Sequence, residues 1–284
     1  MCQSTVSIVI YESSVAQIDR LLQHVRCDTS VLRWVVVDNG SSDEIRDAVR
    51  GMGGIYVRPG KNLGFGGGHN LALKQLADAD APYHLILNPD IVFDGNALGR
   101  LADVMDSHPD VGLVMPKVLY PDGRNQYLCK LLPAPIDLVL RRFLPGPWKA
   151  LARKRAALYE LRFLDCDAPA YVPSLSGCFM FTRRSVLEAV GGFDDRFFLY
   201  MEDVDLCRRM LGASRLLYWP GVTVEHVHQM GSYRSRKLLF LHIRSAIQYF
   251  NKWGWIRDNT RAQINRATLA SRAQSPSSCG QALS

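Results

Sequence analysis

Three acidic residues fall within four positions of one short stretch, Glu202-Asp203-Val204-Asp205, directly after the apolar residues 197–201. A carboxylate beside apolar side chains loses part of its hydration. This raises its pKa and suits a general base that takes the proton of a hydroxyl group. We therefore consider Asp203 and Glu202 as candidate bases. The structural alternative is that these acids stabilise the start of a helix, where the helix dipole favours negative charge.

A second candidate for chemistry is Asn88-Pro89-Asp90, which follows the apolar run 83–87. One carboxylate at the end of a strand is enough to bind Mg²⁺ or Mn²⁺ when diphosphate oxygens fill most of the other positions. A turn residue without a ligand is the alternative interpretation of Asp90.

Two histidines alternate in Glu225-His226-Val227-His228 and would share one face of a strand. His226 and His228 are candidates for one metal ligand and its neighbour, or for contacts to a diphosphate. A solvent-facing pair is the alternative. The hydroxyl-bearing and basic residues that follow also suit a diphosphate: Ser232, Tyr233, Arg234, Arg236 and Lys237.

Two polar turns complete the set of candidate sites. The turn Asp38-Asn39-Gly40-Ser41-Ser42-Asp43 can offer Asp38 to a base or a ribose and backbone N–H groups to an anion. An Asx-turn with a helix cap is its alternative. The stretch Asn62-Leu63-Gly64-Phe65-Gly66-Gly67-Gly68-His69-Asn70 lets the backbone approach a ligand closely, or forms a tight structural turn. It matches neither the P-loop nor the dinucleotide fingerprint.

The elements that must position these residues follow from the hydrophobic pattern. Strands are predicted over 6–10, 32–37, 54–57, 83–87 and 111–115, and helices over 42–50, 70–77, 96–107 and 15–25. Apolar strands alternating with helices predict an α/β fold with a parallel sheet covered on both faces. Ligands bind beyond the carboxyl ends of such strands, where Asp38, Asn39, Arg58 and Asp90 fall.

The second half of the chain has a different composition. Residues 131–163 mix large apolar side chains, prolines and basic residues, which predicts one or two short amphipathic helices. Such a segment suits a membrane surface or an acceptor, or is an ordinary surface helix. Beyond it we expect strands over 171–182, 215–219 and 222–226 and helices over 200–210 and 237–253. From about residue 267 the composition predicts a disordered tail.

Composition narrows the classes of protein. The 284 residues carry 34 Lys and Arg against 27 Asp and Glu, a formal net charge of +7 that suits an anionic partner. No nucleic-acid-binding motif accompanies this charge. The seven cysteines are odd in number and form no C-x-x-C pair, which fits a reducing cytosol. The sequence shows neither a signal peptide nor a run of apolar residues long enough to span a membrane.

The order of these motifs resembles the family 2 glycosyltransferases with the GT-A fold. The resemblance covers residues 4–255, and beyond the motifs already quoted it includes Ser176-Gly177 before Phe179-Met180, and Gly192-Phe193-Asp194. Residues 231–255 are similar to the bacterial rhamnosyltransferase branch that builds O-antigen, lipopolysaccharide core and related polysaccharides. The resemblance implies a Rossmann-like, mostly parallel central sheet flanked by helices, in a single domain with a helical C-terminal extension.

The resemblance also implies roles for single residues in an inverting transfer from a nucleotide-diphosphate sugar. Asp203, or failing it Glu202, would deprotonate the acceptor hydroxyl. Asp90, with His228 or His226, would hold a divalent cation, Mg²⁺ or Mn²⁺, at the diphosphate. The implied acceptor site adds Ser176, Gly177 and Cys178 to the two acids. The implied donor site, with Asp38 on the nucleotide base, consists of Tyr11, Glu12, Asp38, Asn39, Arg58, Asn62, Gly64, Phe65, Asn70, Asn88 and Asp90.

By this resemblance residues 1–115 form a nucleotide-sugar-binding half and residues 116–235 an acceptor-binding and catalytic half. Residues 236–266 form the helical extension and residues 267–284 the tail. Two departures from the family pattern matter. In place of the family's usual aspartate-x-aspartate motif this chain has Asn88-Pro89-Asp90. The first strand runs into Ile10-Tyr11-Glu12-Ser13, where the asparagine usual in the family is missing.

We expect a cytoplasmic enzyme associated with the inner face of the cytoplasmic membrane. The expected donor is dTDP-L-rhamnose, and the expected acceptor is a lipid-linked saccharide or a lipopolysaccharide core. Two alternatives stay open. One is a UDP-hexose or UDP-N-acetylhexosamine transferase of the same fold, and the other is a non-catalytic sugar-nucleotide-binding protein.

Overall fold

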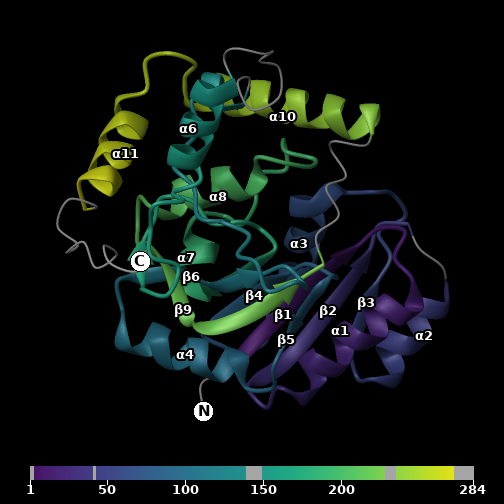
Figure 1. The fold of residues 1–284 in the computed structure, drawn as a ribbon. Helices are drawn as coiled ribbons and strands as arrows, with labels where there is room; N and C mark the ends of the chain where they lie inside the picture. The colour runs from purple at the N-terminus through teal and green to yellow at the C-terminus, as the bar shows by residue number, and fades with distance from the viewer. Residues whose placement is uncertain (1–2, 41–42, 139–148, 228–234, 272–284) are drawn as a thin grey trace.

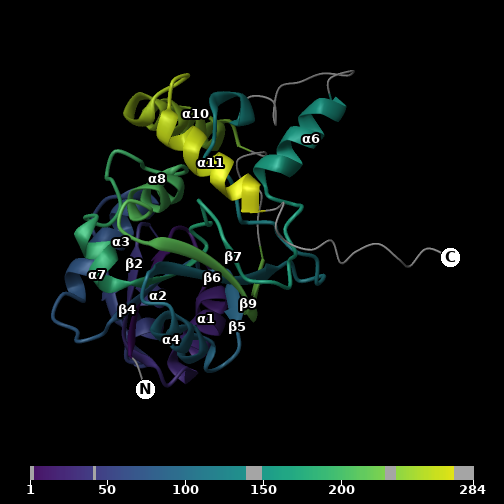
Figure 2. The ribbon, with the colours of Figure 1, turned by 90° about the vertical axis from the view of Figure 1, so that its left-hand side faces the viewer.

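The structure is a computed structural model that describes residues 3–40, 43–138, 149–227 and 235–271. A central sheet crosses the molecule, with helices on both of its faces (Figures 1 and 2). Its strands are β1 (Ser4–Ile10), β2 (Val31–Asp38), β3 (Ile55–Val57), β4 (Tyr83–Leu87), β5 (Ile91–Phe93), β6 (Val111–Leu119), β7 (Ala170–Tyr171), β8 (Phe179–Arg183) and β9 (Arg215–His226).

The helices cover the sheet in the order in which the chain winds between strands. They are α1 (Val15–Cys27), α2 (Asp43–Gly51), α3 (Gly64–Gln75), α4 (Ala97–Ser107), α6 (Lys149–Tyr159), α7 (Arg184–Ala189), α8 (Glu202–Met210), α10 (Arg236–Trp253) and α11 (Asn259–Ser271). Figure 1 shows α1, α2 and α4 on one side of the sheet and α3, α7 and α8 on the other, with α6, α10 and α11 beyond α8. The expected α/β architecture is confirmed.

The strand order is β3-β2-β1-β4-β8-β6-β9-β5, with β7 paired to β9. Strands β1, β2, β3, β4, β6 and β9 run in one direction, so the sheet is mostly parallel, as expected. Strands β5, β7 and β8 run against them. Because β8 is antiparallel to β4, the residues just before β8 lie at the same edge of the sheet as the residues just after β4.

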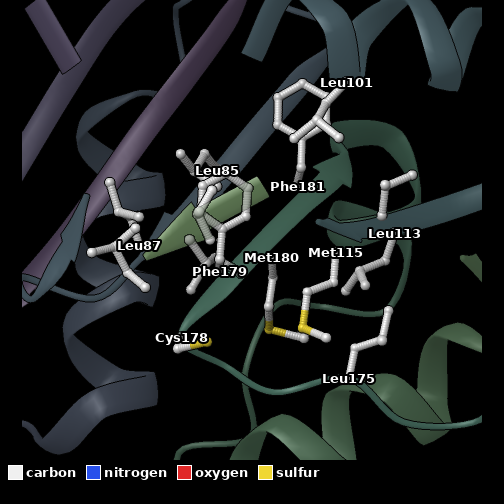
Figure 3. Close-up of a cluster of buried hydrophobic side chains, with 14 of the residues drawn as sticks. Leu85, Leu87, Leu101, Leu113, Met115, Leu175, Cys178, Phe179, Met180 and Phe181 are labelled. Carbon is white, nitrogen blue, oxygen red and sulfur yellow. The ribbon is translucent and has the colours of Figure 1, made fainter. Parts of the chain in front are cut away.

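The core explains why these strands form. All seven residues of β1 are buried, because α1 covers one face of the strand and α3 covers the other. Val9 of β1 packs with Ala72 of α3 and with Leu76, the residue that follows this helix, whereas Ile8 belongs to the cluster that includes α1. Figure 3 shows the centre of the larger cluster, where side chains of β4, β6 and β8 pack together and Cys178, just before β8, lies at one end of the cluster.

The glycine-rich stretch forms the first turns of α3, so the prediction of a helix starting only at residue 70 was too short. The glycines are needed for close packing. A Cβ on Gly64, whose φ is +75°, would lie 2.0 Å from the carbonyl oxygen of Phe198, and a Cβ on Gly68 would lie 2.7 Å from the Val9 side chain. Poor helix propensity is outweighed here by contacts that only glycine permits.

Three other predictions need correction. The strand expected over 171–182 is two strands, β7 and β8, separated by a segment that carries Ser176 and Gly177. The two strands expected over 215–226 are one strand, β9, which continues past Pro220 with a shift of register against β6. Strand β5, directly after Asp90, was not expected, because three residues give no periodic signal.

The C-terminal helices are tied to α8 by buried charges. The guanidinium of Arg208 on α8 donates to both carboxylate oxygens of Asp258, at 2.6 and 2.7 Å, and both side chains are 3% exposed. The Arg208 guanidinium also stacks on the Trp253 ring, 4.2 Å from its centroid. Helix α11 continues to Ser271, past the expected start of the tail at residue 267. Residues 272–284, and residues 139–148 of the basic segment, lie outside the described residues.

Among the described residues no helix is long and apolar enough to cross a membrane.

Candidate active site

The acidic stretch lies at the first turn of α8, where the sequence predicted it. Glu202, Asp203 and Asp205 occupy the first turn, and Arg208 and Arg209 occupy the last turn, so the charges oppose the helix dipole at both ends. Asp203 is half-buried. Its Oδ2 accepts a 3.1 Å hydrogen bond from the backbone N–H of Gly177, and its Oδ1 accepts one of 2.8 Å from the N–H of Val204. The carboxylate is therefore held in one orientation.

The backbone before α8 is unusual. Tyr200 and Met201 both have left-handed conformations, with φ of 68° and 66°. This conformation is costly for side chains other than glycine and persists only where the surrounding structure enforces it. Ser245 Oγ of α10 donates to the Leu199 carbonyl at 2.8 Å, and the Tyr200 ring lies 4.9 Å from that of His242. Helix α10 thus fixes the loop that presents Asp203.

Glu202 differs from Asp203 in its surroundings. It is 6% exposed, and its Oε2 has no hydrogen-bond partner among the described residues. Burial, with a smaller contribution from the nearby Asp203 carboxylate, raises the pKa of Glu202 well above its ordinary value. Burial of Glu202 disfavours the charged form that a base requires, whereas the Asp203 carboxylate is only half-buried and accepts from two backbone N–H groups, so these surroundings favour Asp203 over Glu202 in that role.

Asp90 and His226 meet at the end of the sheet. Strand β5 pairs with β9 so that Ile91 faces His226, which brings the Asp90 carboxylate to 3.2 Å from Nε2 of His226. Burial disfavours the charged imidazole. Hydrogen bonds to Asp90 and Cys178 outweigh that effect and raise the pKa of His226 to about 10. One of the two histidines predicted from the sequence therefore lies against Asp90. The other, His228, lies outside the described residues.

Gln126 orients His226 and was not found by the sequence analysis. Its Nε2 donates to the carbonyl oxygens of His226 (2.7 Å) and Leu119 (3.2 Å), so its Oε1 is the atom that faces Nδ1 of His226, at 2.9 Å. Nδ1 must therefore carry a proton, and Nε2 is directed at Asp90. A hydrogen bond of this kind behind an imidazole is typical of metal-ligating histidines.

These residues fit a divalent cation. Asp90 and His226 supply a carboxylate oxygen and an imidazole nitrogen. Because Gln126 accepts from Nδ1, Nε2 is the nitrogen from which a cation would displace the proton on binding. Within the described ranges no group of three or more His, Cys, Asp or Glu side chains converges on one point. A cation at Asp90 would then take its remaining ligands from substrate oxygens, as Mg²⁺ commonly does in phosphate sites.

The segment with Ser176 and Gly177 joins the two acidic centres. The backbone N–H of Asn88 donates to the Cys178 carbonyl at 2.9 Å, next to Asp90 in the chain, while the N–H of Gly177 donates to Asp203. The Cys178 side chain is buried beside His226. Three of the predicted acceptor residues thus form a backbone bridge between Asp90 and Asp203.

The predicted nucleotide contacts gather at the ends of β1, β2 and β3. Asp38 is buried, and its carboxylate accepts hydrogen bonds from the Gly40 N–H at 2.9 Å and the Tyr56 hydroxyl at 2.7 Å. Tyr56 was not singled out in the sequence. Tyr11 is 50% exposed, and Glu12 and Arg58 are also exposed, so these three side chains face solvent at this edge.

Four predicted donor residues hold the start of α3. The Asn39 side chain accepts from the Leu63 N–H and donates to the Gly64 carbonyl, both at 3.0 Å, and Asn62 accepts from the Gly64 N–H. The side-chain N–H₂ of Asn70 donates to the Phe193 carbonyl and to the Asp195 carboxylate, and its oxygen accepts from the Phe193 N–H. The N–H of Phe65 donates to the Phe198 carbonyl. These contacts have a structural role: those of Asn39 and Asn62 fix the turn that begins α3, and those of Asn70 and Phe65 join α3 to residues 193–198 before α8.

A buried polar chain under α3 also escaped the sequence analysis. Ser7 Oγ lies 2.7 Å from Nδ1 of His69 and 2.8 Å from Nε2 of His84, whose Nδ1 meets Thr5 at 2.8 Å. Burial lowers the pKa of His84 to about 3. Isolated serine, threonine and histidine residues in apolar strands gave no spacing signal that would have identified this network.

Comparison with known proteins identifies the family. A sequence model described as "Glycosyl transferase family 2" matches residues 5–191. The chain belongs to glycosyltransferase family 2. It is 32% identical over 258 residues, 84% of this chain and 81% of the relative, to an N-acetylglucosaminyl-diphospho-decaprenol L-rhamnosyltransferase of Mycobacterium tuberculosis. It is 27% identical to Rhamnosyltransferase WbbL of Escherichia coli, over 85% of this chain and 90% of that protein.

Solved structures show the same fold at lower sequence identity. GalNAc-T7, crystallised with UDP, GalNAc and Mn²⁺, has a TM-score of 0.64 and 14% identity; the match covers 97% of this chain and 52% of that one. The mannosyltransferase PcManGT from Pyrobaculum calidifontis, in complex with GDP-Man and Mn²⁺, has a TM-score of 0.57 and 20% identity; the match covers 97% of this chain and 76% of that one. The expected GT-A fold and glycosyltransferase class of this chain are confirmed.

Proposed function

We propose that this glycosyltransferase moves L-rhamnose from dTDP-L-rhamnose to a saccharide acceptor, with inversion at the anomeric carbon. The observation that carries the proposal is the backbone bridge at residues 176–178. It joins a fixed carboxylate, Asp203, to the Asp90 and His226 pair at one edge of the sheet. The choice of L-rhamnose is supported by the two rhamnosyltransferases among the relatives.

In this proposal Asp203 is the general base. Its carboxylate takes the proton of the acceptor hydroxyl as that oxygen forms a bond to the anomeric carbon. The bond from the same carbon to the diphosphate oxygen breaks on the opposite side, and the nucleoside diphosphate leaves. One in-line displacement of this kind inverts the anomeric centre. Glu202 is not assigned a proton transfer, because its burial disfavours the charged carboxylate.

Asp90 and His226 are proposed to hold the diphosphate end of the donor. A divalent cation, Mg²⁺ or Mn²⁺, bound by these two residues would neutralise charge on the leaving diphosphate. We assign the nucleotide to the edge formed by Asp38, Tyr11, Glu12 and Arg58. Arg58 is suited to phosphate or ribose oxygens because it is exposed and basic.

The acceptor is proposed to be a lipid-linked saccharide or lipopolysaccharide core in bacterial surface polysaccharide synthesis. The relative named for N-acetylglucosaminyl-diphospho-decaprenol supports a lipid-linked acceptor. We place the acceptor hydroxyl between Asp203 and the exposed side of Ser176 and Gly177.

Calorimetric titration with dTDP, UDP and GDP tests the donor assignment. Each nucleotide is added with Mn²⁺ and again with EDTA, to the wild type, to Asp90→Ala and to the matched control Asp94→Ala. Asp94 is an exposed carboxylate at the other end of β5. The proposal predicts tight binding of dTDP that requires the metal and is lost only in Asp90→Ala. A preference for UDP would refute the rhamnosyl donor, and binding unaffected by EDTA would refute the role of Asp90.

A further inference from the structure

Helix α10 exposes a stripe of large apolar side chains. Phe240, Ile243 and Ile247 are 65%, 44% and 44% exposed, and their spacing of three and four residues places them on one face of the helix. The opposite face is covered, because Ser245 and Tyr249 are buried. Phe250, at the edge of the exposed face in the last turn, is buried as well, with its ring centroid 5.2 Å from that of Trp255. We call the exposed face, with the residues that share it, the α10 stripe: Arg236, Lys237, Phe240, Ile243, Arg244, Ile247 and Asn251.

The stripe continues beyond the end of the helix. The indole N–H of Trp255 donates to the side-chain oxygen of Asn251 at 2.8 Å, and the Trp255 ring is 44% exposed. Ile256, the next residue, is 89% exposed. The apolar surface of the protein therefore extends from Phe240 to Ile256 along one edge.

Basic side chains flank this surface, and the stretch of chain that forms it has no acidic residue. Arg236, Lys237, Arg244 and Arg257 are exposed, and residues 226–257 contain no Asp or Glu. Helix α6 lies at the same end of the molecule in both ribbon views (Figures 1 and 2) and adds the exposed Arg153 and Lys154. Exposed aliphatic and aromatic residues bordered by Lys and Arg are the pattern of a helix that lies on an anionic bilayer.

We propose that the α10 stripe, with Trp255 and Ile256, docks this enzyme onto the surface of an anionic lipid bilayer. Phe240, Ile243 and Ile247 would enter the boundary between headgroups and acyl chains, Trp255 would lie at the interface, and the basic residues would contact lipid phosphates. A second copy of the chain is a poorer occupant. A symmetric dimer would bring Arg244 and Lys237 of one copy against the same basic surface of the other.

This docking goes beyond the proposed transfer reaction and explains a feature of the site. The buried side of α10 holds the loop that presents Asp203, through Ser245 and His242. A bilayer against the outer side of α10 therefore lies one helix away from the catalytic loop. The sequence analysis looked for membrane contact in residues 131–163. Among the described residues, the exposed large apolar side chains of 131–163 are Ile136 and Leu158, whereas the α10 stripe with Trp255 and Ile256 has five.

Vesicle co-sedimentation tests the proposal without any sugar donor. The wild type is mixed with vesicles of equal parts phosphatidylglycerol and phosphatidylcholine, and with vesicles of phosphatidylcholine alone. Phe240→Glu and Ile247→Glu are compared with Leu32→Glu, a matched control that is 38% exposed at the start of β2, away from α10. A third variant, Lys237→Gln with Arg244→Gln, keeps the apolar residues and removes two charges.

The proposal predicts that the wild type and Leu32→Glu bind the anionic vesicles alike. Each glutamate on the stripe lowers the partition coefficient by roughly tenfold or more, since it replaces apolar burial by a charge that anionic lipid repels. The glutamine variant loses binding to a similar degree, and about 1 M salt abolishes binding by the wild type because the Debye length falls to about 3 Å. Thermal melting by circular dichroism checks that each variant is folded.

Three results would overturn the proposal. One is unchanged vesicle binding by folded Phe240→Glu and Ile247→Glu. Another is equal binding to both kinds of vesicle with no effect of salt. The last is a wild type that ignores vesicles but forms a dimer in sedimentation equilibrium that Phe240→Glu dissociates, which would assign the stripe to a second copy. If Phe240→Glu fails to fold, the test rests on the Lys237→Gln, Arg244→Gln variant, because the two replaced side chains are exposed and their loss should not affect folding.

Discussion

The backbone N–H of Gly177 donates a 3.1 Å hydrogen bond to Oδ2 of Asp203, the carboxylate that we propose as the base. Asp203 is on α8 and Gly177 precedes β8, so this bond sets the position of one element against the other. The Cys178 carbonyl accepts in turn a hydrogen bond from the N–H of Asn88, so a short run of backbone links Asp203 to the strand end that carries Asp90.

We predict that Gly177→Ala lowers kcat by about 10- to 100-fold, because small displacements of a reacting group have effects of this size. The new Cβ would lie 3.3 Å from Cβ of Asp203 and 3.3 Å from the Phe65 ring, so it would push the carboxylate aside. Gly95→Ala is the control, because no atom lies within 4 Å of its added Cβ. Steady-state kinetics with calorimetric dTDP binding would show nucleotide affinity unchanged. An undiminished kcat in Gly177→Ala would mean that this contact does not position the base.

We predict that Gln126→Ala weakens divalent-cation binding by about 10- to 100-fold, as removal of a hydrogen bond behind a metal ligand commonly does. The variant keeps Asp90 and His226 but frees the imidazole to rotate or to change tautomer. The Mn²⁺ concentration that gives half-maximal dTDP binding measures the effect. Gln75→Ala, on the exposed end of α3, is the control. Equal Mn²⁺ requirements in both variants would argue against His226 as a ligand.

Much of the fold could be predicted because its signals are local and strong. Buried strands such as β1 and β4 are short, mostly apolar runs, and α4 was predicted to within one residue of its observed start. The start of α3 could not be predicted, because glycine disfavours helix and because three of its glycines, Gly64, Gly66 and Gly68, are required by the distant residues Phe198, Phe193 and Val9. Strand β5 depends on its pairing with β9, which no short sequence window contains.

The buried ion pair between Arg208 and Asp258 is predicted to stabilise the C-terminal helices. Asp258→Ala leaves the Arg208 guanidinium buried without its partner, and we expect a loss of about 3–5 kcal/mol in the free energy of unfolding. Urea unfolding measures it. The control is Asp78→Ala, which breaks the surface ion pair between Asp78 (73% exposed) and Arg33 (44% exposed). For this variant we expect a loss of about 1 kcal/mol or less in the free energy of unfolding. Equal losses in the two variants would contradict the structural importance of the Arg208 pair.

Glu202 is predicted to make stability depend on pH. Its pKa is raised in the folded state by burial and by Asp203, so the folded protein binds a proton that the unfolded chain has released. Stability is therefore greatest below the pKa of the unfolded chain, about 4.3, and falls as the pH rises toward the folded-state pKa. Glu202→Gln removes this loss. Thermal melts should show the variant gaining stability over the wild type as the pH rises from about 4 toward neutral, whereas a constant difference would contradict the assignment.

The places of the candidate residues in the fold could be predicted where side chains of known chemistry end or follow strands or begin a helix, as Asp38, Asp90 and the Glu202-Asp203 pair do. The sequence did not show which acid of the Glu202-Asp203 pair, or which of the two histidines, was the better candidate. Only burial separates Glu202 from Asp203, and only the pairing of β5 with β9 places His226 against Asp90. Gln126 and Tyr56 escaped notice because they act through contacts with residues far away in the chain.

The most direct test of the account compares Asp203→Asn with Glu202→Gln in a transfer assay, each with dTDP binding measured by calorimetry. Both substitutions remove one negative charge and keep the size of the side chain. The account predicts that Asp203→Asn lowers transfer by about 100-fold or more, the contribution of a general base, while it still binds dTDP with its metal. Glu202→Gln should keep most of its activity. Transfer by Asp203→Asn at near the wild-type rate, or a loss confined to Glu202→Gln, would contradict Asp203 as the base.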